Sequence, residues 1–289
     1  MRTLLLSCVL VLSACASQQT SQPSSTDTAA SATTGNALPD WDAKVNDPAG
    51  AAAILAVAKD FEGPHAFPPQ IAAAPSEKTF ANVLVLHRMT SKRFIGAMHG
   101  MSRAIGQRCT ECHVEEKFAS DEKDEKRTAR KMLVMSQRLN QTFFHGHVGL
   151  SCYTCHRGSE HPESAPADLK EKLAAMTLPP SLPAVPPDAK RADQVYKNLK
   201  LLGGLPPNQL VTVMQQVSLS LGMGCDACHV AGDWASDDKR PKQTARHMLA
   251  MVESANAELF GQMHDDNAVT CWTCHRGAKH PQRLPPAAP

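Results

Sequence analysis

The sequence predicts a mainly α-helical fold of two tandem modules related by duplication, with little or no β-sheet. The motif Cys-x-x-Cys-His occurs four times among the 289 residues. Equivalent residues of the two halves are separated by a nearly constant number of positions, which indicates an internal repeat. Between the motifs, apolar residues recur every three or four positions, as on one face of a helix, and no stretch alternates as a half-buried strand would.

The four motifs predict covalently bound cofactors. Two thiols three positions apart on a helical turn can reach the two vinyl groups of one porphyrin, and the histidine that follows can bind its iron. We therefore expect four c-type haems in a multihaem cytochrome c, as two dihaem modules with pseudo-twofold symmetry. The motifs are Cys109-Thr-Glu-Cys112-His113, Cys152-Tyr-Thr-Cys155-His156, Cys225-Asp-Ala-Cys228-His229 and Cys271-Trp-Thr-Cys274-His275.

Two other readings of paired cysteines fit less well. Structural zinc sites rarely place a histidine directly after the second cysteine of every pair. A thioredoxin-like redox motif would occur once, within a βαβ pattern that this sequence does not have. Covalent haem attachment is the interpretation that accounts for all four copies.

The N-terminus predicts export and a lipid anchor. Residues 1–14 have a positive start, an apolar run and small residues, as in a bacterial lipoprotein signal peptide. Cleavage before Cys15 would leave that thiol to carry lipid. We expect a flexible tether at 15–40 and an N-terminal docking segment at 41–75. The expected location is the periplasmic side of a bacterial membrane, held there by the lipid.

Composition and charge restrict the partners. The formal net charge is +2, but eight propionates would add about −8 and four oxidised irons would return about +4. The loaded protein should therefore be acidic, which disfavours nucleic acid and favours a cationic redox partner. Aromatic residues make up only 4% of the chain, and porphyrins would supply the missing apolar surface.

The duplication sets the domain boundaries. Met98 and Met214 lie 116 positions apart, as do Cys109 and Cys225. After a short length change, Cys152 and Cys271 lie 119 apart. We expect module 1 at 76–161, a Pro-rich linker at 162–188, module 2 at 189–282 and a tail at 283–289.

Each iron needs a ligand on its distal side, and Met98 and Met214 are candidates. Each precedes the first cysteine of a motif by eleven positions. A straight helix would carry Met98 about 22 Å from His113, so the chain must reverse between them. Gly106 and Gly222 lie where this turn is needed. A methionine at helical spacing could instead be a packing residue, and four others compete for the role of ligand: Met101, Met135, Met223 and Met251.

The remaining charged residues give weaker indications. The run at 115–127 is expected to be a solvated face. Arg157 and Arg276 each follow a proximal histidine, where they could pair with propionates or be ordinary surface residues.

The chain resembles a known family, the cytochrome c subunits of photosynthetic reaction centres. The resemblance covers about 76–161 and 189–282 and is carried by motifs, spacing and duplication together. The second half repeats it from Met214 to Gly277. In the first half it rests on Met98 through His113, Thr128-Ala-Arg-Lys-Met132-Leu-Val-Met135, Asn140 and Gly149-Leu-Ser-Cys152-Tyr-Thr-Cys155-His156-Arg157-Gly158.

The resemblance implies three methionine-ligated haems and one that takes a histidine from the opposite half. By position, Met98 would serve the Cys109 motif, Met132 the Cys152 motif and Met214 the Cys225 motif. The Cys271 motif would take His147. Its alternatives are Met248, which repeats the position of Met132, then His145 and His264. The remaining histidines are expected on the surface or in packing: His65, His87, His99, His161, His247 and His280.

These observations predict an electron-transfer protein and not an enzyme, because every iron has a candidate for its sixth ligand. The partners would be redox proteins: a reaction-centre core, a soluble cytochrome or a respiratory complex. The region before residue 76 is largely Ala, Ser and Pro, which slightly favours a non-photosynthetic relative of the reaction-centre subunit. Two other classes stay open at this point, a multihaem reductase with a vacant iron and a conductor that assembles into filaments.

Overall fold

The structure is a computed structural model that describes residues 69–260 and 268–285. Within those ranges it is helical, and β-structure is confined to isolated bridges. The predicted mainly α fold is therefore confirmed. The predicted signal peptide, Cys15, the tether, the docking segment up to residue 68 and His264 lie outside the described residues.

Module 1 is arranged around one long helix that precedes the first motif. Helix α5 (Ser91–Ile105) begins where the Thr90 hydroxyl accepts the N–H of Arg93, and it ends at Gly106 with φ +68°. The predicted turn at this glycine is confirmed. The other helices are α3 (Pro69–Ala73), α4 (Ser76–Thr79), α6 (Cys109–Cys112), α7 (Asp124–Phe143) and α8 (Cys152–His156).

Module 2 repeats this order. Helix α10 (Pro207–Leu221) ends at Gly222 with φ +61°, as α5 ends at Gly106. A 3-10 turn, η2 (Cys225–Ala227), carries the third motif, and α11 (Arg240–Phe260) and α12 (Cys271–His275) follow. The predicted linker contains one short helix, α9 (Leu169–Ala175), which packs against α10. A further 3-10 turn, η1 (Ala192–Gln194), leads into the module.

A close backbone contact ties the two motifs of each module together. The N–H of Gly158, just after the second motif, donates to Ala104 O at 2.8 Å. A Cβ on Gly106 would overlap Gly158 O. In module 2, Gly277 N–H donates to Ser220 O at the same distance, and a Cβ on Gly222 would overlap Gly277 O. Glycine is therefore required at the turn for its conformation and for its small size.

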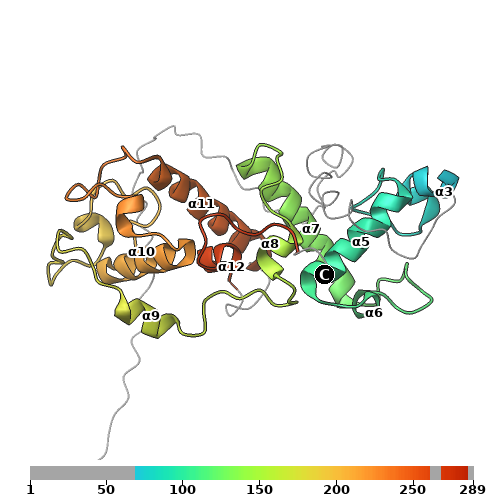
Figure 1. Ribbon diagram of the computed structural model, residues 1–289, viewed down its shortest axis with the longest axis horizontal. Coiled ribbons are helices and arrows are strands. Elements are labelled where there is room, and N and C mark those ends of the chain that lie inside the picture. Colours follow the sequence, from blue (N-terminus) through green and yellow to red (C-terminus); the bar gives the residue numbers. More distant parts are fainter. Residues whose placement is uncertain (1–68, 261–267, 286–289) are drawn as a thin grey trace, which may run out of the picture. The chain divides into compact units, whose positions relative to one another are not determined.

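The two modules meet along their long helices. Helices α7 and α11 lie side by side, and α8 packs against α12 (Figure 1). Leu139 and Leu150 of module 1 share one buried cluster with Met251 and Ala255 of module 2. This apolar cluster joins the halves, and all the described residues belong to one compact unit.

Reciprocal contacts relate α8 and α12 as a pseudo-twofold axis would. Arg157 donates to Cys274 O at 2.8 Å, and Arg276 donates to Cys155 O at 3.4 Å. The same exchange occurs with the flanking hydroxyls. Ser151 donates to Arg283 O, and Thr270 donates to Ser164 O at 2.5 Å.

Candidate haem-binding sites

Met98 of α5 and the first motif line one cavity of about 620 Å³ in module 1. Cys109, Cys112 and His113 reach it from the α6 turn. Most of the remaining lining is apolar, with Val85, Leu86 and Leu133 of the buried cluster among it. The cavity thus combines an apolar cradle with two thiols, an imidazole and a thioether. Those are the groups that covalent haem attachment and two-sided iron ligation require.

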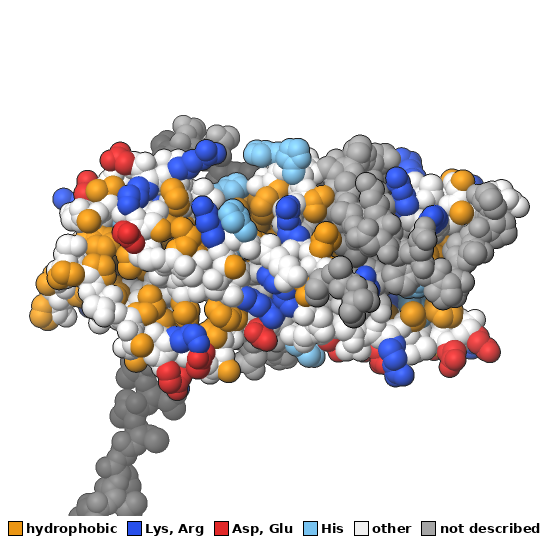
Figure 2. Space-filling view, viewed as in Figure 1, with side chains coloured by type: hydrophobic (Ala, Val, Ile, Leu, Met, Phe, Trp, Pro, Cys, Tyr) orange, Lys and Arg blue, Asp and Glu red, His pale blue; other side chains and the backbone are white. Residues whose placement is uncertain are grey.

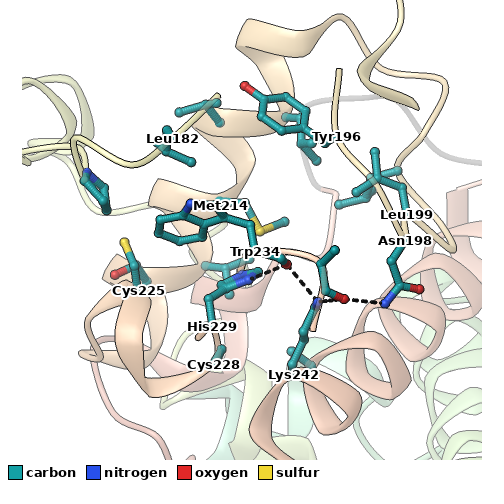
Figure 3. A pocket seen from close by; sticks show the side chains of 18 of the residues that line it. Leu182, Tyr196, Asn198, Leu199, Met214, Cys225, Cys228, His229, Trp234 and Lys242 are labelled. Atoms are coloured by element: carbon teal, nitrogen blue, oxygen red, sulfur yellow. Dashed lines mark hydrogen bonds between the residues drawn. The ribbon is translucent and has the colours of Figure 1, made fainter. Parts of the chain in front are cut away.

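Module 2 forms the equivalent cavity from equivalent residues. Met214, Cys225, Cys228 and His229 line a cavity of about 370 Å³. Figure 3 shows the Met214 sulfur and the His229 ring on the same cavity, with the Trp234 indole beside them. The Trp234 indole N–H donates to Ser181 O at 3.0 Å, so the linker helps to enclose this cavity.

The linings of the two cavities distinguish between the methionines that could be ligands. Met101 also lines the first cavity and Met223 the second. Their repeat positions hold Val217 and Gln107. Among the described residues, Met98 and Met214 are therefore the one methionine pair that occupies matched positions in both cavities. This favours them as ligands over the packing alternatives.

All four motif histidines are held in the tautomer that an iron ligand needs. Each Nδ1 lies within hydrogen-bond distance of a backbone carbonyl, which can only accept, so Nδ1 carries the proton. Nε2 then keeps its lone pair for a metal, the usual outer-shell arrangement of ligating histidines. The pairs are His113 with Phe118 O at 2.8 Å, His156 with Ser159 O at 3.0 Å, His229 with Trp234 O at 3.3 Å and His275 with Ala278 O at 2.9 Å.

Burial shifts the pKa of several histidines and cysteines of the motifs. It lowers the pKa of His156, His229 and His275, which keeps the imidazoles neutral as a metal ligand must be. Burial also raises the pKa of the Cys152 thiol to about 11. A thiol kept protonated in apolar surroundings is a poor nucleophile, so this site does not resemble a thiol-redox centre.

The second and fourth motifs lie against each other at the pseudo-twofold axis. Cys155 Sγ and Cys274 Sγ are 3.1 Å apart, and α8 packs on α12. By contrast, the first and third motifs lie in the two separate cavities. Porphyrins carried by Cys155 and Cys274 would therefore be neighbours.

The candidate ligands for these two inner motifs lie on α7, on α11 and in the loop after α7. Met132 is half-buried on α7. Met248, on α11, packs against the cluster between α7 and α11. His147 and His145 are exposed in the loop that ends at Gly149. None of the hydrogen bonds or cavities described above joins these side chains to a motif histidine, so Met132, His147 and Met248 stay predictions.

The expected solvated face at 115–127 is wrong at one position. Lys126 is only 9% exposed, and its repeat partner Lys242 is 8% exposed. Both ammonium groups donate to backbone carbonyls of the loop after the motif. The signal that could have found them was their 116-residue spacing within an otherwise divergent charged stretch.

Arg157 and Arg276 are not the ordinary surface residues that one expectation made them, and their pairing with propionates stays a prediction. Their guanidinium groups bind backbone carbonyls of the opposite module. Arg157 also donates to Gln282 Oε1 at 2.8 Å, and Arg276 lies 3.7 Å from Glu163 Oε1. They act here as bridges between the two inner motifs and not as ordinary surface residues.

A helical fold, duplicated motifs and tautomer-fixed histidines define a c-type cytochrome that carries electrons. The profile of the family described as photosynthetic reaction centre cytochrome C subunit matches the chain twice, at residues 22–167 and 164–285. The chain belongs to the photosynthetic reaction centre cytochrome c subunit family. That family binds c-type haems and consists of electron-transfer proteins and not enzymes, which confirms the non-enzymatic prediction and removes the reductase.

Individual relatives agree with the family assignment. The photosynthetic reaction center cytochrome c subunit of Rubrivivax gelatinosus is 27% identical over 250 residues, covering 71% of this chain and 68% of the relative. That of Thermochromatium tepidum is 38% identical over 104 residues, which is 35% of this chain but only 26% of the relative. Cytochrome c-554 of Chloroflexus aurantiacus is 42% identical over 84 residues, covering 28% of this chain and 20% of the relative.

The family is periplasmic and membrane-associated. Among the helices that the structure describes, none is both long and apolar enough to span a bilayer.

Proposed function

We propose that this protein is a tetrahaem electron carrier, with one haem at each of four sites numbered in chain order. Each haem would supply a one-electron iron couple. The observation that carries the proposal is the shared lining of the two outer cavities, where both thiols, the histidine and a matched methionine of each site meet. The fixed tautomer of all four histidines extends the same chemistry to the inner sites.

The proximal ligands of sites 1 to 4 would be His113, His156, His229 and His275. The distal ligands of sites 1 to 3 would be Met98, Met132 and Met214. His147 would serve site 4, with Met248 as its alternative. A bis-histidine iron has a lower potential and a different low-spin EPR signal from a His/Met iron, so EPR of the oxidised protein separates His147 from Met248.

Contacts between the motif helices support one spatial order. Helix α5, which carries Met98 of site 1, packs on α8 of site 2. Helix α8 packs on α12 of site 4, and α12 packs on α10, which carries Met214 of site 3. Electrons would therefore pass along the sites in the order 1, 2, 4, 3, with the inner pair joined at Cys155 and Cys274. The protein holds the sites in register and keeps water from them.

The proposal includes a lipid on Cys15 and redox proteins as partners. A lipidated N-terminus would keep the carrier at the periplasmic face of the membrane without a spanning helix. A soluble cytochrome or a respiratory complex would exchange electrons with it. In a host that matures c-type cytochromes, the purified protein should carry four haems by intact mass. A colourless protein, or a mass below that of four adducts, would refute the proposal.

The relatives' names favour a second, more specific role. Three of the matched proteins are described as photosynthetic reaction center cytochrome c subunits, so this chain could re-reduce a photo-oxidised pigment. Flash spectroscopy on membranes of the native organism discriminates the two. Rapid haem oxidation after a flash indicates the reaction-centre role. Redox turnover during respiration without any flash response indicates a respiratory carrier.

A further inference from the structure

Lys126 and Lys242 are the two lysines buried in the described part of the chain. A buried ammonium is rare in proteins unless it is paired. Lys126 donates to Phe118 O at 2.9 Å and to Ser120 O at 2.8 Å, and it lies 3.2 Å from an Asp121 oxygen. The three N–H donors of the Lys126 ammonium therefore all have partners.

Lys242 repeats this arrangement in module 2. It donates to Trp234 O at 2.9 Å, Ala235 O at 3.0 Å and Ser236 O at 2.7 Å, and lies 3.3 Å from Asp237. The corresponding loops of the two modules thus each enclose a buried lysine ammonium.

Each lysine shares its first carbonyl with a proximal histidine. Phe118 O accepts from Lys126 and from His113 Nδ1, and Trp234 O accepts from Lys242 and from His229 Nδ1. In Figure 3 the dashed lines from His229 and Lys242 meet at one oxygen. The inner sites differ: among the described residues, no lysine donates to the Ser159 or Ala278 carbonyl that holds His156 or His275.

The shared carbonyl has two effects of the same sign. An ammonium on the oxygen draws electron density from it, so the carbonyl is a weaker acceptor for the histidine N–H. The imidazole then donates less to a bound iron, and the oxidised state is less stabilised. The local charge acts likewise, because one carboxylate faces two cations. Asp121 pairs with Lys126 and Arg130, and Asp237 pairs with Lys242 and Arg246.

We propose that Lys126 and Lys242 are positioning residues that raise the reduction potentials of sites 1 and 3 through the histidine-binding carbonyl. The inference rests on the proposed function, since it requires haem at those sites. One electron reaches the iron in each couple, and no bond of the lysine forms or breaks. A buried lysine on the histidine-binding carbonyl is thus a feature of the outer sites, whereas the inner motifs have Arg157 and Arg276 on cysteine carbonyls instead.

The test compares Lys126→Met and Lys242→Met with Lys131→Met, whose lysine is exposed on the same helix α7. Intact mass first establishes four haems in each variant, which tests the proposed function separately. Spectropotentiometric titration should then show one midpoint potential lowered in Lys126→Met and a different one lowered in Lys242→Met. Lys131→Met should match the wild type, and Lys126→Arg, which keeps the cation, should restore most of the potential.

Unchanged potentials in both methionine variants, a rise, or an equal shift of all four would overturn the proposal. Lysine is also a loop anchor here, so a variant could lose haem. In that event the wild-type protein decides. When it is reduced and labelled with ¹⁵N-lysine, two ammonium signals should be protected from solvent exchange. If every lysine ammonium exchanges rapidly, the buried arrangement is absent and the proposal fails.

Discussion

Met98 is the residue whose role the first cavity defines most narrowly. Met98→Ala should leave the thioethers intact but remove one distal ligand, so one of four haems should lose its low-spin signal and its potential should fall. Intact mass measures haem attachment, EPR measures the low-spin signal, and a redox titration measures the potential. Met101→Ala is the matched control, because Met101 lines the same cavity without a methionine at its repeat position. Four unchanged potentials in Met98→Ala would exclude this ligand.

Asp121 links the buried lysine to acid stability. The hydrogen bond from Arg130 holds the pKa of Asp121 well below its usual range, helped by Asn82 and Lys126. A carboxyl whose pKa is lower in the folded protein than in the unfolded chain stabilises fully above the unfolded value, near pH 4. That contribution is lost as the pH falls towards the folded value.

Asp121→Asn should therefore weaken the loss of stability below about pH 4 and lower the stability at neutral pH. Denaturant unfolding at a series of pH values measures this. Glu115→Gln, at an exposed position in the same run, should keep the wild-type pH dependence. Identical acid profiles for Asp121→Asn and the wild type would show that the ion pair makes no contribution.

The turn after α5 allows a graded test at the scale of one element. Gly106→Ala combines a left-handed backbone with overlap of Gly158 O, whereas Gly158→Ala has φ +89° but open space around the added methyl. Left-handed backbone costs an L-residue about 1–2 kcal/mol, and the overlap adds to this. Gly204→Ala, in open space and without a positive φ, is the neutral control.

The free energy of unfolding of the haem-loaded protein should fall most in Gly106→Ala, less in Gly158→Ala and hardly at all in Gly204→Ala. Equal losses at the first two positions would show that the contact between the turn and Gly158 does not contribute. The same comparison at Gly222, whose Cβ would meet Gly277 O, tests the repeat.

At the scale of the whole molecule, the sequence predicted what covalent chemistry and duplication determine. The motif spacing and the 116-residue register predicted the helix, turn and motif order in both modules. The turn at Gly106 followed because the chain must reverse there. The register alone could also have marked Lys126, whose partner Lys242 keeps it.

Other features depend on contacts that no local pattern reports. Arg157 binds a carbonyl 117 positions away, so its sequence neighbours carry no sign of that role. Helix α9 lies within the linker, whose many prolines predict irregular structure and not a helix. The sequence does not choose between His147 and Met248 as the ligand of site 4, because the two residues lie on elements of different modules and the choice depends on contacts between them.

Surface character differs between the outer sites. Phe118 beside site 1 is 54% exposed, while Trp234 beside site 3 is held by Ser181 of the linker. In Figure 2, hydrophobic side chains gather over the part of module 2 that contains α10. Leu178 and Leu201, which both precede α10 in the chain, are exposed leucines. The two ends of the proposed relay therefore present different surfaces to a partner.

The contact between the modules yields the last prediction. Arg157 and Arg276 each bridge to the opposite inner motif, and a hydrogen bond from a charged group contributes about 1.5–3 kcal/mol. Arg157→Met should lower the unfolding free energy by an amount in that range and slow electron exchange between sites 2 and 4. Arg93→Met, on the exposed side of α5, should do neither. Because the two arginines bridge the same pair of motifs, the loss of unfolding free energy in the double variant of Arg157 and Arg276 should differ from the sum of the two single losses. Strictly additive losses would show that the bridges act independently.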